Sequence, residues 1–154
     1  MTSEHTWPTV LSHLVEGSDL SISESTWAMQ AVMAGEATPA QLGGLLVALR
    51  IKGETVDEIV GLARTMRAFA TPVRVGRDDL IDTAGTGGGR QTFNVSTTAA
   101  LIAAGAGCAV AKHGNRSATG LSGSADVLEA LGARIDLPPA AVAQCIADAG
   151  FGFM

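Results

Sequence analysis

The sequence is poor in aromatic residues: Phe and Trp make up 4% of its 154 residues, and Tyr is absent. No apolar run approaches the ~20 residues that a membrane-spanning helix needs, so we expect no membrane partner. The first ten residues, MTSEHTWPTV, lack the basic-then-apolar pattern of a secretory signal. The two cysteines, Cys108 and Cys145, lie in apolar segments away from any pair of histidines. Neither a disulfide framework nor a zinc site is therefore expected, and the reducing cytoplasm is the expected location.

Basic residues are also scarce, with 10 Lys and Arg against 15 Asp and Glu and a formal net charge of −5. Binding to nucleic acid requires a basic face that neutralises phosphates, so we expect no nucleic acid partner. Any anion site must then be local. Apolar residues, by contrast, are abundant at 47% of the chain, mainly as Ala, Leu and Val. A chain of this length and composition can bury a hydrophobic core.

The first part of the chain has the pattern of consecutive helices. Apolar residues recur at helical spacing, for example at Leu42, Leu45, Leu46 and Leu49. An earlier helix is expected around residues 7–16. Three capping boxes, in which an acceptor side chain precedes a Glu or Gln by three residues, mark further helix starts: Ser21 with Glu24, Thr38 with Gln41, and Thr55 with Glu58. The sequence therefore predicts a helical module over residues 1–71, a packing unit for which oligomerisation is the main functional alternative.

The pattern changes after Thr71 and Pro72. The segment LIDTAG reads as a short buried strand, followed by a glycine loop, a helix of small residues, and the strand CAVAKHG. Two more helices and a strand at residues 150–154, which we expect to be interior, complete the series. Strands alternating with helices indicate parallel crossovers. The fold class is α/β, with the first part of a parallel α/β domain over residues 72–154. Because a parallel sheet needs both faces covered, we expect the chain to be part of a longer protein.

A glycine loop, GTGGGRQTFN, follows the first strand and leads into a helix that starts NVSTT. Glycines let the backbone turn N–H groups toward a phosphate, and the start of a helix favours an anion. Asn94, Ser96 and Thr97 add side-chain donors. The loop matches neither the Walker pattern nor the glycine spacing of a dinucleotide fingerprint. A flexible turn without a ligand is the alternative.

A second loop, KHGNRSATGLSGS, follows the next strand. It brings Lys112, His113 and Arg116 together with several hydroxyl residues. Ligands bind beyond the carboxyl ends of strands in open α/β sheets, so two such loops would suit a ligand with two phosphate groups. The alternative is a solvated basic turn. His113 has no nearby acid to orient it, and no nucleophile elbow is present, so a catalytic triad is not supported.

The segments DTAGTGG, TFNVSTTAA and VAKHGNRSATGLSGSADVLEALG together resemble the anthranilate phosphoribosyltransferase family. The resemblance extends over nearly the whole chain, including LLVALRIKGETVDEIVGLARTMR, but over only the first half of a family member. It implies transfer of phosphoribose from phosphoribosyl pyrophosphate to the amine of anthranilate, with Mg²⁺ and release of pyrophosphate. It also implies tryptophan biosynthesis and a homodimer joined through the helical module, with residues 72–154 the first part of the domain that binds phosphoribosyl pyrophosphate.

The resemblance carries roles to individual residues of both loops. The positions that it implies for phosphoribosyl pyrophosphate are Gly85, Gly88, Thr92, Asn94, Val95, Ser96, Thr97, Lys112, His113, Gly114, Asn115, Arg116, Ser117, Ala118, Thr119, Gly120 and Ser124. Among these, it implies catalytic roles for Lys112, Asn115 and Arg116 and a magnesium contact for Ser96. It further implies that Gly85, His113 and Asn115 lie along the path of anthranilate.

Three departures from the family pattern stand out. The glycine loop is one residue shorter than the usual GTGGDGxxTFN and lacks its Asp, which bears on magnesium handling and loop geometry. Gly120 stands where the family has a hydroxyl donor. The family's later acidic pair for a second magnesium, and an Arg for the anthranilate carboxylate, would lie beyond Met154, so we expect this chain alone to have little transferase activity. A nucleoside phosphorylase relative and a non-catalytic nucleotide-binding chain are the alternative functions.

Overall fold

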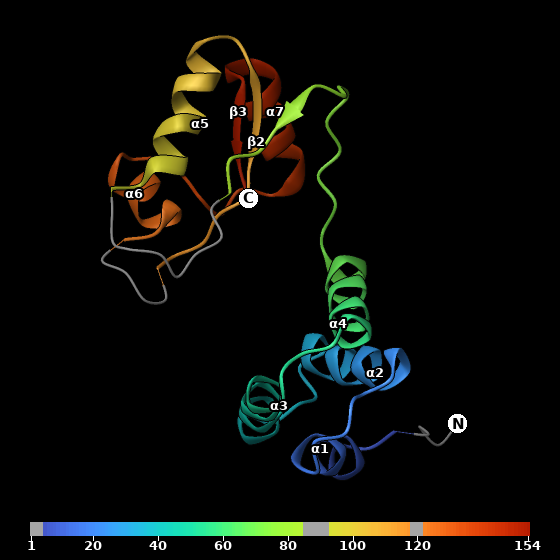
Figure 1. Ribbon diagram of the computed structural model, residues 1–154. Helices are drawn as coiled ribbons and strands as arrows, with labels where there is room; N and C mark the ends of the chain where they lie inside the picture. Colours follow the sequence, from blue (N-terminus) through green and yellow to red (C-terminus); the bar gives the residue numbers. More distant parts are fainter. Residues whose placement is uncertain (1–4, 85–92, 118–121) are drawn as a thin grey trace. The chain divides into compact units, whose positions relative to one another are not determined.

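The computed structural model describes residues 5–84, 93–117 and 122–154. The chain divides into two compact units, Met1–Ala70 and Thr71–Met154, each shown in Figure 1. The elements of the first unit are α1 (Trp7–Val15), α2 (Ile22–Met33), α3 (Pro39–Lys52) and α4 (Val56–Phe69). Those of the second are β1 (Leu80–Ile81), α5 (Val95–Gly105), β2 (Ala109–Lys112), α6 (Ser124–Ala130), α7 (Pro139–Ala149) and β3 (Phe151–Phe153).

The three predicted capping boxes are confirmed at the starts of α2, α3 and α4. In each, the hydroxyl of Ser or Thr accepts the N–H of the third helical residue, whose side chain accepts the N–H of the cap. Two donors that the helix leaves unpaired are thereby satisfied. The helix expected around residues 7–16 is also present, as α1.

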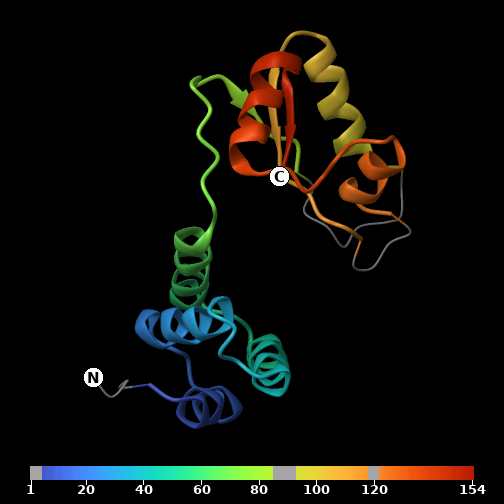
Figure 2. The same cartoon turned by 180° about the vertical axis from the view of Figure 1, so that it is seen from behind.

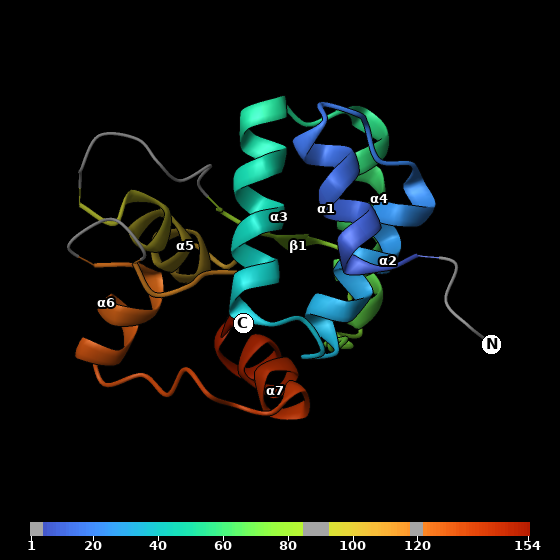
Figure 3. The same ribbon diagram turned by 90° about the horizontal axis from the view of Figure 1, so that it is seen from below.

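In the first unit, α1 packs on α3 and α2 packs on α4, an arrangement visible in Figure 3. The buried core consists of Val10, Leu14, Leu20, Ala28, Leu45 and Leu49. The α2 and α4 backbones approach closely at Gly61, because a Cβ there would overlap the hydroxyl of Ser25 and lie 2.8 Å from the carbonyl oxygen of Ile22. Gly61 therefore sets the separation of these two helices.

The second unit contains a parallel three-stranded sheet in the order β1-β2-β3. Ala109 and Ala111 of β2 contact the core formed with Val142 and Ile146 of α7. Since side chains alternate along a strand, Lys112 points to the other face, where it reaches the start of α5. The helices α5 and α7 thus cover opposite faces of the sheet, as Figures 1 and 2 show.

The predicted series of strand, helix, strand, two helices and strand is confirmed. The first strand, expected to be buried, is instead exposed at both residues of β1. The expectation of an interior strand at residues 150–154 is corrected in one respect. β3 pairs with β2 through the register Val110↔Phe151 and Lys112↔Phe153, and it lies at an edge of the described sheet while β2 lies at its centre.

Candidate functional site

The candidate site lies where β1 and β2 end and α5 begins. Asp82 and Thr83 follow β1, and Lys112 is the last residue of β2. Because the two strands are parallel and in register from Leu80↔Ala109, their carboxyl ends meet at one edge of the sheet. This edge is where ligands bind in open α/β folds.

Lys112 is the most deeply buried charged side chain of this unit's described part, with 1% of its surface exposed. Its ammonium donates to the carbonyl oxygen of Thr83 at 3.2 Å and to the hydroxyl of Ser96 at 3.4 Å. The Thr83 hydroxyl in turn donates to the carbonyl oxygen of Ser96 at 2.7 Å. Burial lowers the pKa of Lys112 below its ordinary value, and the negative charge of Asp82 partly opposes this shift. Both hydrogen-bond partners of the ammonium are neutral, so its charge is available to an anion.

The start of α5 lacks a side-chain cap among the described residues. Asn94, at the cap position, instead donates through its amide nitrogen to the hydroxyl of Ser122 at 3.0 Å, which links the α5 start to the segment before α6. The hydroxyl of Thr97, itself 1% exposed, has no hydrogen-bond partner in the described parts of the chain. A buried hydroxyl without a partner is uncommon in native structures. An uncapped helix start beside an orphaned hydroxyl and a buried ammonium is suited to an anion.

The second loop begins directly after Lys112. The N–H of His113 donates to the carboxylate of Asp82 at 3.2 Å, and the N–H of Gly114 donates to the carbonyl oxygen of Met154 at 3.1 Å. Asn115 accepts the N–H of Arg116 through its side-chain oxygen at 2.8 Å. The loop backbone is therefore anchored to the ends of both neighbouring strands.

Arg116 is engaged by two carboxylates of α6. It forms ion pairs with Asp126 at 3.0 Å and with Glu129 at 2.8 Å. Glu129 and Asp126 raise the pKa of Arg116 above its already high value. Unlike the ammonium of Lys112, this guanidinium has its charge offset by its own neighbours.

Six of the predicted site positions lie outside the described residues: Gly85, Gly88, Thr92, Ala118, Thr119 and Gly120. Among the described ones, the structure brings Ser96 and Lys112 into contact. Thr97 is buried in the first turn of the same helix, whereas the neighbouring Val95 is half exposed. Ser117 and Ser124 lie on the second loop and at the start of α6.

Five acidic or hydroxyl residues that join the site's hydrogen-bond network were not among the predicted positions: Asp82, Thr83, Ser122, Asp126 and Glu129. A signal was present for Asp126, which follows Gly123 by three residues, the spacing of a capping carboxylate. The groups through which Asp82 and Thr83 join the site, the N–H of His113 and the carbonyl oxygen of Ser96, are remote in sequence, so no local pattern identifies them.

No group of three or more His, Cys, Asp or Glu side chains among residues 5–84, 93–117 and 122–154 is arranged to hold a metal ion. Within the same ranges, no helix has both the length and the apolar character needed to cross a membrane.

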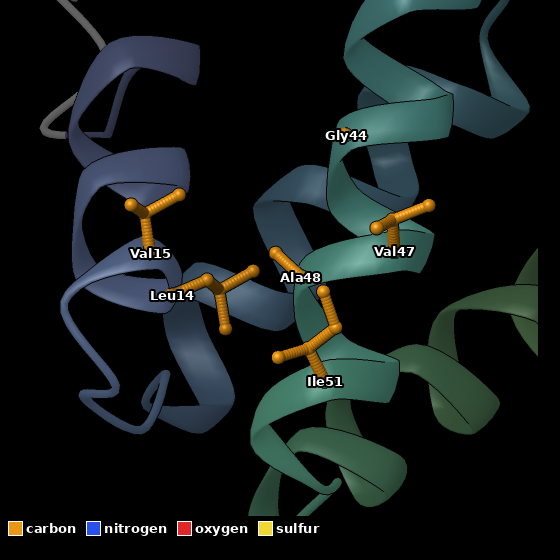
Figure 4. A pocket seen from close by; sticks show the side chains of 6 residues that line it. All are labelled: Leu14, Val15, Gly44, Val47, Ala48 and Ile51. Atoms are coloured by element: carbon orange, nitrogen blue, oxygen red, sulfur yellow. The ribbon is translucent and has the colours of Figure 1, made fainter.

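The helical unit has an apolar pocket of about 340 Å³ between α1 and α3. Leu14 and Val15 line it from α1, and Val47 and Ile51 line it from α3, as Figure 4 shows. Val15 is 79% exposed, Val47 59% and Ile51 82%. Contiguous exposed apolar side chains of this kind mark interaction surfaces.

The structure thus defines a class: a helical bundle module followed by a parallel α/β unit with donors gathered at the ends of its strands. Residues 8–70 match the helical bundle domain of the glycosyl transferase family, and residues 77–154 match its a/b domain. The chain belongs to this glycosyl transferase family.

Similar proteins carry a more specific name. The chain is 58% identical over 145 residues to the anthranilate phosphoribosyltransferase of Moorella thermoacetica, a match that covers 94% of this chain and 43% of that protein. It is 57% identical over 150 residues to the protein of the same name from Nocardioides sp., covering 96% and 43% respectively. The chain therefore spans less than half the length of these curated relatives.

Two solved structures are similar in fold. Anthranilate phosphoribosyltransferase from Thermus thermophilus matches with a TM-score of 0.81 and 49% identity, over 94% of this chain and 44% of the other. The enzyme from Saccharomyces cerevisiae, in complex with PRPP and Mg, also matches with a TM-score of 0.81, at 27% identity over 99% of this chain and 47% of the other.

Proposed function

We propose that the protein transfers phosphoribose from phosphoribosyl pyrophosphate to the amine of anthranilate, giving N-(5-phosphoribosyl)anthranilate and pyrophosphate, a step of tryptophan biosynthesis. The identity of 58% to a protein of that name supports this reaction. The structural observation that carries the proposal is the buried ammonium of Lys112, which lies against the uncapped start of α5. We assign this place to the phosphate groups of the substrate.

The chemistry needs no protein nucleophile. The bond between the anomeric carbon of the ribose and an oxygen of pyrophosphate breaks, the anthranilate nitrogen bonds to that carbon, and the nitrogen then loses a proton. Negative charge grows on the departing pyrophosphate, so fixed positive charge and N–H donors accelerate its departure. Lys112 supplies the charge, while the N–H groups of Ser96 and Thr97 in the first turn of α5 and the hydroxyl of Thr97 supply donors. We assign His113 and Asn115, with Gly85, to the path of anthranilate.

The proposal includes Mg²⁺, which a similar structure contains together with PRPP. Magnesium bound to a substrate phosphate keeps several waters and takes only one or two protein ligands. A single hydroxyl, that of Ser96, fits this mode, whereas an all-protein cage does not fit the described residues. Ser96 would hold the ion, which would neutralise phosphate charge when bound. The ammonium of Lys112 beside that hydroxyl requires the anionic substrate to accompany the metal.

The proposal also includes a cytoplasmic homodimer. The exposed apolar side chains of Val15, Val47 and Ile51 support a second copy covering the pocket between α1 and α3. Burying apolar area of this kind contributes roughly 25 cal/mol per Å². The free thiols of Cys108 and Cys145 are compatible with a reducing compartment.

Two measurements test the reaction. Calorimetry of the chain with phosphoribosyl pyrophosphate and Mg²⁺ is expected to give saturable binding. For turnover, residues 1–154 are joined to the part of the Moorella thermoacetica relative that follows its match to this chain. We expect the joined protein to consume anthranilate, followed by the loss of its fluorescence. Phosphorolysis of a pyrimidine nucleoside without consumption of anthranilate would assign the chain to the phosphorylase alternative instead.

A further inference from the structure

Asp126, in the first turn of α6, accepts three donors. Its Oδ2 accepts the N–H of Gly123 at 2.7 Å and the N–H of Ser117 at 3.1 Å, while its Oδ1 accepts Nη1 of Arg116 at 3.0 Å. The N–H groups of Gly123 and Ser117 lower the pKa of Asp126, so its carboxylate is charged near neutral pH. One side chain thereby ties the second loop to the helix that follows it.

Glu129, one turn further along α6, also connects this helix to the second loop. Its two oxygens pair with Nη1 and Nη2 of Arg116 at 2.8 Å and 3.1 Å, the two-point geometry that makes Arg–carboxylate pairs specific. With Asp126, the group of one cation and two carboxylates has a formal charge of −1. Arg116 therefore adds little attraction for an anion, although it holds the loop firmly against α6.

The loop backbone lies directly on the start of α6. The N–H of Ala125 donates to the carbonyl oxygen of Asn115 at 3.3 Å. A Cβ on Gly123 would overlap that oxygen and lie 2.5 Å from the nitrogen of Ser117. This close approach requires a glycine at position 123. Together with the hydrogen bonds of Asp126 and Glu129, it fixes where the Asn115–Ser117 segment lies against α6.

We propose that Asp126 is a positioning residue for the phosphate site: together with Arg116 and Glu129 it fixes the backbone of Asn115–Ser117, and none of the three acts by contact with the anion. This inference rests on the proposed function, which assigns the second loop to the substrate. Lys112, whose hydrogen-bond partners are neutral, is then the cation that meets the phosphates.

Two variants of Asp126 distinguish the effect of losing the loop's position from the effect of losing a negative charge. Asp126→Ala and Asp126→Asn both remove one negative charge, but only Asn keeps an oxygen that accepts the N–H groups of Ser117 and Gly123. Inorganic pyrophosphate is titrated into the full chain by calorimetry. We expect Asp126→Ala to weaken binding about tenfold and Asp126→Asn to stay within about threefold of the unchanged chain, the range set by one or two lost hydrogen bonds. Asp136→Asn, at an exposed ion pair with Arg134, measures the effect of the charge alone.

Tighter binding in both Asp126 variants would overturn the inference, because it would mean that Arg116, once released, binds the anion directly. Amide hydrogen exchange at Ser117 gives a readout without ligand: we expect faster exchange in Asp126→Ala and near-unchanged exchange in Asp126→Asn. Equal exchange in the unchanged chain and in Asp126→Ala would also overturn it. If the unchanged chain fails to bind pyrophosphate, the proposed function loses its phosphate site, while the exchange rates still decide the positioning role.

Discussion

Two lysine side chains, Lys52 and Lys112, show how burial changes what a charge does. Lys52 lies between Asp19 at 2.8 Å and Glu58 at 3.0 Å, and Asp19 in particular raises its pKa. Among the described residues, Lys112 donates hydrogen bonds only to neutral groups, and burial lowers its pKa against the opposing charge of Asp82. A buried cation that is paired with carboxylates has a structural role. A buried cation that is not hydrogen-bonded to a carboxylate costs stability unless an anionic ligand binds to it.

Replacing Lys112 with Met is expected to separate binding from stability. Affinity for phosphoribosyl pyrophosphate should fall by about 1.5–3 kcal/mol, the contribution of a hydrogen bond to a charged group. The melting temperature should stay level or rise, because Met removes a buried charge and keeps a similar volume. Calorimetry and thermal unfolding are measured side by side, with Arg50→Met, an exposed cation of α3, as the control. A large fall in melting temperature with unchanged affinity would contradict the assignment.

Glu58 is fully buried and predicts how the helical unit responds to acid. Burial alone would raise its pKa, but the N–H groups of Leu20 and Thr55 and the ammonium of Lys52 together lower it. A lowered pKa stabilises the fold above the unfolded value of about 4.3, and this stabilisation is lost as pH falls through the folded value.

Replacing Glu58 with Gln tests this role. At pH 7 it should lower the free energy of unfolding by about 3 kcal/mol, because it leaves Lys52 partly unpaired in the interior. The difference from the unchanged protein should shrink as pH falls from the unfolded value of about 4.3 through the lowered pKa of folded Glu58, because Glu58 then takes up a proton. Denaturant unfolding at several pH values measures both, with the exposed Glu54→Gln as the control. A difference that stays constant with pH would contradict the assigned role.

At the scale of elements, the helix starts could be predicted because their signals are short. A capping box needs only two residues three positions apart, and all three predicted boxes form. The order of strands and helices was also predictable from apolar runs between glycine-rich loops. The hydrogen bonds within the site were not predictable. Lys112 donates to the carbonyl oxygen of Thr83, and Arg116 pairs with carboxylates ten and thirteen residues further along the chain. Such pairs depend on which loops the sheet brings together, which no local pattern specifies.

Two helical glycines give opposite expectations for the same substitution. Gly61→Ala should destabilise the helical unit by about 1–3 kcal/mol, because the added Cβ meets Ser25 and the backbone of Ile22. Gly43→Ala, in α3, should stabilise it by about 0.5–1 kcal/mol, because the new Cβ meets nothing within 4 Å beyond its own stretch of helix and Ala favours the helix. Chemical denaturation compares the two variants. Equal effects would mean that the separation of α2 and α4 does not depend on Gly61.

At the scale of the whole molecule, the chain has two units with separate cores, one around Leu45 and one around Ile146. The sequence predicted this organisation through its change of pattern after Thr71. What it did not reveal is which apolar residues remain outside the core. Val47 and Ile51 are four residues apart, as Leu45 and Leu49 are, yet they are exposed while the latter two are buried. Only the packing of α1 on α3 decides which side of the helix is covered.

The exposed face of α3 leads to a prediction about assembly. Replacing both Val47 and Ile51 with Glu should convert the proposed dimer to a monomer, because two charges would have to enter an apolar contact. Light scattering coupled to size-exclusion chromatography measures the mass. Ile102→Glu, at an exposed position of α5, serves as the control and should leave the mass unchanged. A double variant with the mass of the unchanged protein would place the contact elsewhere.

The burial of both lysines has a practical consequence for chemical labelling. Lys52 and Lys112 are the only lysines of the chain, and their side chains are 6% and 1% exposed. Reagents that acylate side-chain amines should therefore react slowly with the folded protein and rapidly once a unit opens. Since each unit contains one lysine, mass spectrometry of the labelled peptides would report the opening of the two units separately, without any engineered probe.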